Sequence, residues 1–593
     1  MKRLMSGNEA IARGAWEAGC TVSTAYPGTP STEITDFLAR HREIKTEWSP
    51  NEKVALEVAA GAAMAGARAI ACMKHVGVNV AADPLFTLSY TGVKGGLLVI
   101  SADDPQMHSS QNEQDNRHYA RAAKLPMLEP SDSDEALRFA KSAFELSEKN
   151  DCPVMLRTTT RISHGQSLAE EGSRAASPIE LGPEKKPPKW VMLPAFARGR
   201  HPLVEERMAR LALEAETFPE NRIEMGDKKI GIVTNGVAYQ YAREAFPHAS
   251  FLKLGLAWPL PKELFKKFAG LVEKVYVVEE LDPFIEDWVR GLGIEVTGKA
   301  AFPIIGEFTP AIVKRGILGP DAAGADIKMD PALPPRPPIM CPGCPHRGLF
   351  TALRELKIFA CGDIGCYTLA APPPLSALDT CLCMGAGIGQ NFGIEKALGR
   401  GDKSVAVIGD STFFHSGITP LMDMAYNRSQ GTVIILDNRT TAMTGRQGNP
   451  GAGYDSCGES TCTVDIPKLC AALGIKRVRT VDPYQLEETE AVLREEVAAP
   501  EPSVVISLSP CMLIPEAKSV KRPPLKVNLE RCSGCKVCFK VACPAIAFIV
   551  EDGEYVNREG KTKKRKGFAV VDELSCTGCR VCAQVCSAGA LEE

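Results

Sequence analysis

The chain has 593 residues, of which 24% are charged, and its formal net charge is -3. A balance this close to neutral gives no field of one sign, which excludes a surface built to collect nucleic acid or to coat a membrane. The length exceeds what one hydrophobic core supports, so we expect roughly four domains of about 100 to 200 residues each.

The N-terminus, MKRLMSGNEAIARGAWEAGC, has a short apolar stretch and lacks a small-residue cleavage site. No apolar run approaches the ~20 residues that a helix needs to span a bilayer. We therefore expect a globular protein that binds neither membrane nor nucleic acid and is located in the cytoplasm. In that compartment the 21 cysteines favour metal binding over disulfides.

The first 170 residues predict an α/β domain. The segment TVSTAYPGTPSTEITDFL, residues 21–38, predicts a strand, a Pro/Gly turn and a helix. Residues 51–85 predict a helix of small residues followed by a strand and another loop. The turn contains Thr29, the helix contains Glu52 and Glu57, and the later strand leads to His75.

Residues 171–338 predict three segments. Residues 171–225 contain GPEKKPPKW and a charged helix, which indicates a connecting segment. Strands and helices alternate through residues 226–318, as in a small parallel α/β domain. Residues 319–338 are rich in proline and predict a linker to a further domain at 339–515.

The domain at 339–515 contains a β-α-β unit. Residues 405–408 predict a buried strand that ends at Gly409, Asp410 and Ser411, and residues 419–426 predict a helix. A second strand at 433–436 ends at Asp437 and Asn438. Polar residues thus follow both strands, where open α/β sheets bind ligands. An ordinary Rossmann-like unit with a turn aspartate is the alternative for this motif by itself.

The tail, residues 525–593, contains two cysteine runs with the spacings C-x2-C-x2-C-x4-C-P and C-x2-C-x2-C-x3-C. Three cysteines at such steps reach three corners of an iron-sulfur cube, and the fourth ligand comes from elsewhere. Structural zinc sites are the alternative, but they prefer two C-x2-C pairs at a wider separation. The tail therefore predicts an electron conduit.

This tail resembles the two-cluster ferredoxins of bacteria, in which each run supplies the fourth ligand of the other cluster. The resemblance implies two [4Fe-4S] clusters, one on Cys532, Cys535, Cys538 and Cys586 and the other on Cys576, Cys579, Cys582 and Cys543. The chain departs from the pattern by one extra residue before Cys543 and by the insertion EDGEYVNREGKTKKRKG between the two runs.

Residues 403–445 resemble the diphosphate-binding motif of thiamine diphosphate enzymes, a Gly-Asp-Gly followed further along by Asn-Asn. The resemblance implies a diphosphate site at Gly409, Asp410 and Ser411. It implies Mg²⁺ held by the Asp410 carboxylate, the Asn438 amide and the Thr440 carbonyl, with phosphate oxygens and water completing the octahedron. Ser411 replaces the second glycine of the motif and Asp437 replaces the first asparagine.

The order of these parts resembles the 2-oxoacid:ferredoxin oxidoreductases over essentially the whole chain. The resemblance is sharpest at SGNEAIARGAWEAG, SADDPQMHSSQNEQDNRHYA, CPGCPHRGLF, LDNRTTAMTG and the tail, and it favours the large subunits that act on arylpyruvates. It implies a multidomain α/β fold: two parallel-sheet domains that bind thiamine diphosphate, a small α/β domain and an α+β ferredoxin-like domain at the C-terminus.

The implied activity is oxidative decarboxylation of a 2-oxoacid, above all indole-3-pyruvate, with coenzyme A as co-substrate and ferredoxin as electron acceptor. Family members contain a further domain that this chain lacks, so we expect a smaller β subunit in an α2β2 assembly. Three alternatives stay open: an oxidoreductase for another 2-oxoacid, a non-redox thiamine diphosphate decarboxylase with structural clusters, and an electron-transfer subunit without its own active site.

The family places a glutamate beside N1′ of the aminopyrimidine, where a dry pocket raises the pKa of a carboxyl group that passes a proton to that nitrogen. Position in ALEVAAGAAMAGA favours Glu57, with Glu52 second. A solvated helix position is the alternative for Glu57.

Thr29 in YPGTPS is implied to contact the substrate carboxylate. His75 is a candidate proton or carboxylate partner, as are His108, Arg117 and His415, and a structural role is the alternative for each histidine.

Related oxidoreductases hold a further [4Fe-4S] cluster near the thiamine on a Cys-x2-Cys motif and two distant cysteines. The corresponding set here is Cys341, Cys344, Cys366 and Cys511. Buried thiols are the alternative, because this domain also contains the unassigned Cys361, Cys381 and Cys383.

Overall fold

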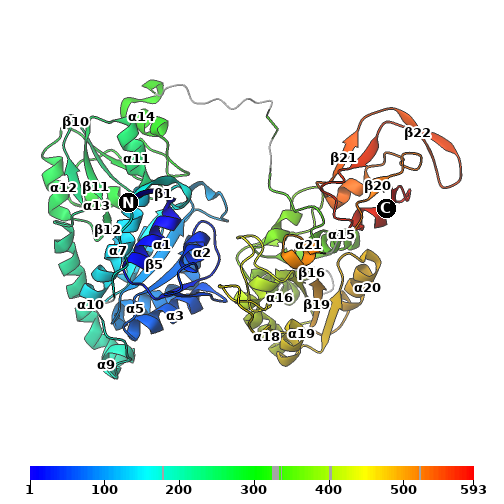
Figure 1. Cartoon of the computed structure of the whole chain (residues 1–593), viewed down its shortest axis with the longest axis horizontal. Coiled ribbons are helices and arrows are strands. Elements are labelled where there is room, and N and C mark those ends of the chain that lie inside the picture. The colour runs from blue at the N-terminus through cyan, green and yellow to red at the C-terminus, as the bar shows by residue number, and fades with distance from the viewer. Residues whose placement is uncertain (177–178, 323–332, 335–336, 400–403, 520–521, 593) are drawn as a thin grey trace. The chain divides into compact units, whose positions relative to one another are not determined.

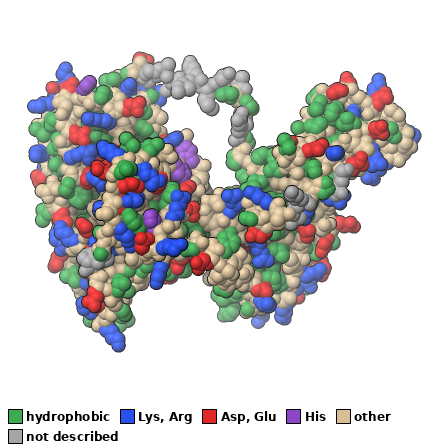
Figure 2. Space-filling view, viewed as in Figure 1, with side chains coloured by type: hydrophobic (Ala, Val, Ile, Leu, Met, Phe, Trp, Pro, Cys, Tyr) green, Lys and Arg blue, Asp and Glu red, His purple; other side chains and the backbone are tan. Residues whose placement is uncertain are grey.

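The computed structural model describes residues 1–176, 179–322, 333–334, 337–399, 404–519 and 522–592. The chain forms two compact units, Met1–Ala332 and Leu333–Glu593, and each is described by itself (Figure 1). Figure 2 shows Lys and Arg side chains interspersed with Asp and Glu over the visible face, as the small net charge predicts. Within the described ranges, no helix combines the length and the apolar character needed to cross a membrane.

The first unit is built on a seven-stranded sheet. Neighbouring strands pair in parallel except β12, which pairs antiparallel to β6. The strand order is β12 (Leu256–Trp258), β6 (Met127–Leu128), β7 (Val154–Thr159), β5 (Leu97–Asp103), β4 (Ala69–Lys74), β2 (Val22–Ala25) and β3 (Lys45–Trp48).

Alternate residues of this sheet face two hydrophobic cores, as the strand period of two requires. In β4, Ala71 and Met73 belong to one core and Ile70 and Cys72 to the other. Helices of the first core are α3 (Glu52–Met64), α5 (Ala82–Thr91) and α6 (Arg117–Ala123), and those of the second are α1 (Gly7–Glu17), α2 (Thr32–Leu38) and α7 (Ser133–Asn150). Short helices α4 (His75–Val80) and α8 (Thr160–His164) follow β4 and β7 directly.

A four-stranded sheet forms the other part of this unit, in the order β13 (Val275–Val278), β10 (Asp227–Asn235), β11 (Ala249–Leu254) and β9 (Arg222–Glu224). Its helices are α11 (Gly236–Ala245), α12 (Lys262–Ala269), α13 (Phe284–Gly291) and α14 (Pro310–Leu318). The connecting residues form α9 (Pro187–Trp190) and α10 (Pro194–Ala215), and β1 (Lys2–Ser6) pairs with β8 (Gln166–Glu170).

Two strands pair with the sheet of another predicted segment and not within their own. Strand β9 joins the small sheet although it precedes residue 226, and β12, from within 226–318, forms the edge of the larger sheet. The predicted domains therefore separate these short strands from the sheets with which they form hydrogen bonds. Most of the predicted linker at 319–338 lies outside the described residues.

The second unit contains a six-stranded sheet in which every neighbouring pair is parallel. Its order is β15 (Thr380–Cys381), β14 (Phe359–Gly362), β16 (Ser404–Gly409), β17 (Thr432–Asp437), β19 (Ser503–Leu508) and β18 (Arg477–Val481). One core contains residues of α15 (His346–Leu356) and α20 (Leu486–Val497). The other contains residues of α16 (Ala386–Leu398), α18 (Ile418–Tyr426) and α19 (Ile466–Ala472).

The predicted β-α-β unit is thus present as β16, α18 and β17, preceded by the short α17 (Asp410–Thr412) and the π-helical turn Phe413–Gly417. Beyond α21 (Pro515–Ser519), the tail consists of three two-stranded sheets. They pair β20 (Lys526–Val527) with β25 (Leu591–Glu592), β21 (Ile546–Ile549) with β24 (Phe568–Val571), and β22 (Gly553–Val556) with β23 (Thr562–Arg565). A 3-10 helix at Val537–Val541 and α22 (Val581–Gln584) lie within the two cysteine runs and contain Cys538 and Cys582.

Candidate active site and cysteine centres

The carboxyl ends of β16 and β17 bring the diphosphate motif together. Asp410 follows β16 and Asn438 follows β17, and these parallel strands place Gly409 opposite Leu436. Asp410 is 2% exposed and Asn438 is 7% exposed. Burial, and after it the charge of Asp437, raises the pKa of Asp410 to about 7. Two carboxylates therefore adjoin each other in a dry environment.

These carboxylates fit a divalent cation. Asp437 forms an ion pair with Arg439 at 3.4 Å, whereas no Lys or Arg in the described part of the chain pairs with Asp410. A buried carboxylate without a counter-ion is unfavourable. Carboxylate and amide oxygens are ligands that Mg²⁺ accepts beside phosphate. The oxygens of Asp410 and Asn438 supply that donor set.

Neutral donors hold Asp410 in place. The backbone N–H of Ser411 donates to its Oδ1 at 2.8 Å, and the side chain of Asn449 donates to its Oδ2 at 3.2 Å. The backbone N–H of Thr440 donates to Oδ1 of Asn438 at 3.1 Å. The sequence does not predict the contact between Asn449 and Asp410, because the two residues are 39 positions apart and Asn449 lies in a loop without periodicity.

A histidine from the CPGCPH segment contacts Asn438. Nδ2 of Asn438 lies 3.4 Å from Nε2 of His346. Burial lowers the pKa of His346 to about 4, so its imidazole is neutral at pH 7 and accepts a hydrogen bond from the amide. The amide oxygen of Asn438 is thereby turned away from His346. Sequence analysis did not identify His346, because 92 residues separate the two side chains.

Tyr367 contacts Gly409, the glycine before Asp410, and fixes its position. The Tyr367 hydroxyl accepts from the N–H of Gly409 at 3.0 Å and donates to Asp363. Burial raises the pKa of Asp363 to about 7, and Gly385 donates its N–H to that carboxyl at 2.7 Å. A Cβ on Gly409 would lie 2.9 Å from the Tyr367 ring, so this turn requires glycine.

In the first unit, the loops after β2, β4 and β5 meet at one edge of the sheet. Lys74, the last residue of β4, donates from Nζ to the carbonyl of Ser109 at 2.6 Å. The Ser109 hydroxyl donates to the carbonyl of Thr29 at 3.3 Å. A Cβ on Gly28 would lie 3.0 Å from Cβ of Lys74. The YPGTPS turn with Thr29 therefore packs against Lys74.

Lys74 is a nearly buried cation without a carboxylate partner. It is 9% exposed, and burial lowers its pKa to about 8. The nearby Asp104 accepts instead from Ser109, Ser110 and Thr160, and no ion pair joins Lys74 to an Asp or Glu of the described ranges. A buried ammonium group is stabilised by an anion. This edge, where Thr29 is expected to contact the substrate carboxylate, therefore fits a carboxylate ligand, and Lys74 is the residue that sequence analysis did not identify.

The two glutamates considered for proton transfer lie on different sides of α3. The side chain of Glu57 is 47% exposed and pairs with Lys53 one turn away. This position does not provide the dry pocket on which the choice of Glu57 depended, so that choice is corrected. Glu52, the second candidate, is 5% exposed, and a Cβ on Gly77 would lie 2.6 Å from its Oε1. Glu52 therefore faces the short helix α4, which follows β4.

The histidine at the start of α4 is fully buried. Nε2 of His75 lies 3.1 Å from Oδ1 of Asn112, and its Nδ1 has no hydrogen-bond partner among the residues that the structure describes. His75 follows Lys74 directly and precedes Gly77, against which Glu52 packs. The structure thus places His75 and Glu52 at the first turn of α4.

The three remaining candidates for proton transfer or carboxylate binding are His108, Arg117 and His415. His108 pairs with Glu307 at 3.0 Å. Arg117 is fully buried and pairs with Asp115 and Glu279, which accounts for its position. His415 lies in the π-helical turn that follows Asp410, where it contacts Ser416.

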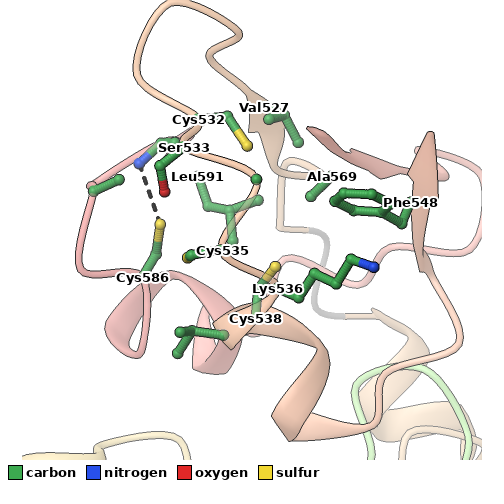
Figure 3. A pocket seen from close by; sticks show the side chains of 14 residues that line it. Val527, Cys532, Ser533, Cys535, Lys536, Cys538, Phe548, Ala569, Cys586 and Leu591 are labelled. Atoms are coloured by element: carbon green, nitrogen blue, oxygen red, sulfur yellow. Dashed lines mark hydrogen bonds between the residues drawn. The ribbon is translucent and has the colours of Figure 1, made fainter. Parts of the chain in front are cut away.

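One tail set lines a single pocket, and Figure 3 shows its sulfur atoms directed toward that pocket: Cys532, Cys535, Cys538 and Cys586. Burial and, after it, the charges of the other three cysteines raise the pKa of Cys538 to about 11. The backbone N–H of Ala590 lies 3.4 Å from Sγ of Cys586, as a donor to that sulfur. The set thus combines cysteines from both runs, although Cys586 lies far along the chain from the others.

The structure brings the second tail set together in the same way: Cys576, Cys579, Cys582 and Cys543. Burial and the charges of the other three raise the pKa of Cys582. A tetrahedral zinc site with Zn–S bonds of about 2.3 Å would hold its sulfurs within about 4 Å of one another. Among the described residues, no three cysteine sulfurs converge within 4.8 Å, which does not favour the zinc alternative.

A third set of cysteines meets beside the diphosphate motif: Cys341, Cys344, Cys366 and Cys511. Burial, with a smaller contribution from the charge of Cys341, raises the pKa of Cys344 to about 12 and that of Cys366 to about 11. The backbone N–H of Cys511 donates to the carbonyl of Asn438 at 3.0 Å. This set therefore adjoins the edge that carries Asp410 and Asn438.

The three cysteine sets follow one another through the second unit. Tyr484 lies between the third set and the second, since burial and the charges of Cys579 and Cys344 raise its pKa. The second set adjoins the first, because the charge of Cys538 contributes to the raised pKa of Cys582. The order is the diphosphate motif, the Cys341 set, the Cys576 set and the Cys532 set.

Comparison with known proteins identifies the same parts. Residues 13–217 match the family model "Pyruvate flavodoxin/ferredoxin oxidoreductase, thiamine diP-bdg". Residues 363–507 match "Thiamine pyrophosphate enzyme, C-terminal TPP binding domain", and residues 524–589 match "4Fe-4S dicluster domain". The first match extends past residue 170, into α10.

Curated relatives are similar to this chain in sequence over its full length. Indolepyruvate oxidoreductase subunit IorA of Methanothermobacter thermautotrophicus is 42% identical over 100% of this chain and 97% of its own length, and that of Pyrococcus horikoshii is 41% identical over 100% and 97%. A solved 2-oxoglutarate:ferredoxin oxidoreductase from Magnetococcus marinus, with 2-oxoglutarate, coenzyme A and succinyl-CoA bound, is 17% identical with a TM-score of 0.44, over 53% of this chain and 64% of that chain. On the identity and coverage of the full-length relatives, the chain belongs to the family of indolepyruvate oxidoreductase subunit IorA.

Proposed function

We propose that this chain catalyses the oxidative decarboxylation of arylpyruvates, indole-3-pyruvate foremost, to an acyl-CoA and CO₂ and reduces ferredoxin. The observation that carries the proposal is the adjacency of the Asp410 and Asn438 edge to the Cys341 set, followed by the two tail sets. The names of the full-length relatives support the substrate.

Asp410 and Asn438 would hold Mg²⁺ and through it the diphosphate of the thiamine cofactor, with the Thr440 carbonyl as a further ligand. When bound, thiamine diphosphate supplies a nucleophilic carbon and an electron sink for the carboxyl-bearing carbon of a 2-oxoacid. His346 orients the Asn438 amide, and Tyr367 fixes the Gly409 turn beside it. Residues around a metal site tune its affinity in this way.

Glu52 takes the role first considered for Glu57. Its carboxyl group would hold the proton that is exchanged with N1′ of the aminopyrimidine, because it is buried at the start of α3. The approach of the Gly77 backbone fixes this side chain. The side chain of Glu57 is instead exposed and pairs with Lys53.

Lys74 would bind the carboxylate of the 2-oxoacid, with the Thr29 hydroxyl beside it. The ammonium group reaches the Ser109 loop that also holds the Thr29 turn. A charged hydrogen bond in a nearly buried place is stronger than one in water. The buried Nδ1 of His75, next in the sequence, has no partner among the described residues and would form a hydrogen bond with a polar group of substrate or cofactor.

Three [4Fe-4S] clusters would form on the three cysteine sets, and the third set would receive electrons nearest the cofactor. Electrons would then pass along the order of the sets to ferredoxin. A smaller β subunit, in an α2β2 assembly, completes the coenzyme A interface in this proposal, and the word "subunit" in the relatives' names supports such a partner.

The test uses the complex purified without oxygen, with and without its partner subunit. Indole-3-pyruvate, phenylpyruvate, pyruvate and 2-oxoglutarate are offered with coenzyme A, and reduction of methyl viologen is followed. We expect the arylpyruvates to have the highest kcat/KM. Consumption of 2-oxoacid without dye reduction would instead indicate a non-redox decarboxylase, and cofactor-free protein without turnover would indicate an electron-transfer subunit.

A further inference from the structure

The insertion between the two cysteine runs forms a basic hairpin. Strands β22 and β23 pair antiparallel, with Tyr555 opposite Lys563, and the ribbon extends outward from the rest of the tail (Figure 1). Four of the six residues from 561 to 566 are lysine and one is arginine. We call residues 553–566 the basic hairpin. Its lysines at 561, 563, 564 and 566 are all exposed.

The base of the basic hairpin is fixed to the loop of the Cys532 set. Nη1 of Arg565 donates to the carbonyl of Cys532 at 2.9 Å. A Cβ on Gly534 would lie 2.3 Å from the carbonyl oxygen of Gly567, so the two backbones touch. Cys535, in the same loop, is exposed. The hairpin therefore adjoins the one cysteine set that is farthest from the diphosphate motif.

Most of the cationic side chains of the basic hairpin form no ion pair with a carboxylate of the described residues. Lys561 pairs with Glu559 at 3.4 Å, and Lys564 lies opposite Glu554 in the strand register. Lys563 and Lys566 form no ion pair with a residue of the described ranges, and Lys563 lies opposite an uncharged tyrosine. Such a surface attracts a negatively charged protein over a distance of about one Debye length, ~8 Å at physiological salt.

We propose that the basic hairpin docks the acidic one-electron carrier protein that accepts electrons from the Cys532 set. This inference rests on the proposed function, which requires a carrier, and adds where and by what charge the carrier binds. At each docking, one electron leaves the reduced cluster and one arrives on the oxidised carrier, with no bond or proton transferred. Electrostatic docking also favours fast exchange of carriers, because it raises the association rate more than the affinity.

The test is the variant Lys563→Glu/Lys566→Glu in the anaerobic complex with its partner subunit. Lys228→Glu/Lys229→Glu, an exposed lysine pair at the start of β10, is the matched control. An acidic two-cluster ferredoxin is the probe, and methyl viologen, a small dication that a basic surface does not attract, is the comparison. At low salt we expect the KM for ferredoxin to rise about tenfold in the hairpin variant, with methyl viologen reduction unchanged. Calorimetric binding of oxidised ferredoxin should weaken in parallel, and the difference should shrink at high salt.

Unchanged ferredoxin KM and binding in the hairpin variant would overturn the proposal, as would an equal effect in the control variant. Loss of the partner subunit from the purified variant would also overturn it, by identifying the hairpin as a subunit interface. If the wild-type complex reduces neither dye nor ferredoxin with any 2-oxoacid, the proposed function fails. Calorimetric binding of ferredoxin then still tests the hairpin, so the two failures are distinguishable.

Discussion

Nδ2 of Asn438 lies 3.4 Å from Nε2 of His346, and this contact joins the CPGCPH segment to the diphosphate motif. Cys344, two residues before His346, belongs to the Cys341 set, and Cys511 of that set donates to the Asn438 carbonyl. Asn438 therefore contacts both the residue that orients its amide and the backbone of a proposed cluster ligand. In the proposed function, the cofactor site and the first electron acceptor would thus share one structural element.

Replacing His346 by Phe removes the acceptor for the Asn438 amide. We expect the affinity for thiamine diphosphate with Mg²⁺ to fall about 10- to 100-fold, the range typical of residues that orient metal ligands. Isothermal calorimetry with the full complex measures it, and His248→Phe, at an exposed position, serves as the control. Equal affinities in both variants would show that His346 does not orient Asn438.

The two glutamates of α3 give a matched pair. Glu52→Gln should retain the cofactor but slow exchange of the thiazolium C2 proton by about 10²- to 10⁴-fold, because the proton on N1′ loses its partner. Glu57→Gln should leave exchange unchanged, since the Glu57 side chain is 47% exposed. NMR after acid quench in deuterated buffer measures both rates. The opposite ranking would restore the original choice of Glu57.

Lys74 gives a pH dependence. Burial lowers its pKa to about 8, so the ammonium is charged below pH 8 and loses its proton as the pH rises through that value. If it binds the substrate carboxylate, kcat/KM for indole-3-pyruvate should fall about tenfold per pH unit above pH 8.

Lys74→Met should lower kcat/KM about 10- to 100-fold at pH 7 and should remove the fall in kcat/KM that begins near pH 8. Lys45→Met, at an exposed position of β3, is the control and should keep both. A break at the same pH in Lys74→Met would assign the titration to another group.

The Cys341 set predicts a third cluster that can be counted. Anaerobically purified chain should contain about twelve iron atoms, and Cys366→Ser should reduce this to about eight. Cys383→Ser, at an exposed cysteine outside every set, should leave the count unchanged. About eight iron atoms in the unaltered chain would leave only the two tail clusters.

The sequence predicted those parts of the site whose signal is local. The β16 and β17 ends follow from strand periodicity, and the two runs of closely spaced cysteines follow from their spacing. The exchange of Cys586 and Cys543 between the two tail sets was implied only by the resemblance to bacterial ferredoxins. Lys74 and His346 escaped notice because their partners, Ser109 and Asn438, lie 35 and 92 residues away. Contacts over such distances depend on the sheet topology and not on any local pattern.

The sequence did not separate Glu52 from Glu57 for a different reason. Both residues lie in one helix whose small residues carry little amphipathic contrast, so the sequence does not show which side faces the protein. The short edge strands β9 and β12 likewise escaped prediction, because two or three residues are stabilised by their neighbours more than by their own propensity.

The central claim is that electrons from a 2-oxoacid reach the cysteine centres from the Asp410 and Asn438 site. The direct measurement mixes the anaerobic complex with indole-3-pyruvate and coenzyme A and follows bleaching of the iron-sulfur absorbance, in the unaltered chain and in Asp410→Ala. We expect bleaching in the unaltered chain only, while dithionite bleaches both, because the variant keeps its clusters but loses Mg²⁺ and thiamine diphosphate. Bleaching of Asp410→Ala by the substrate, or none in the unaltered chain, would contradict the account.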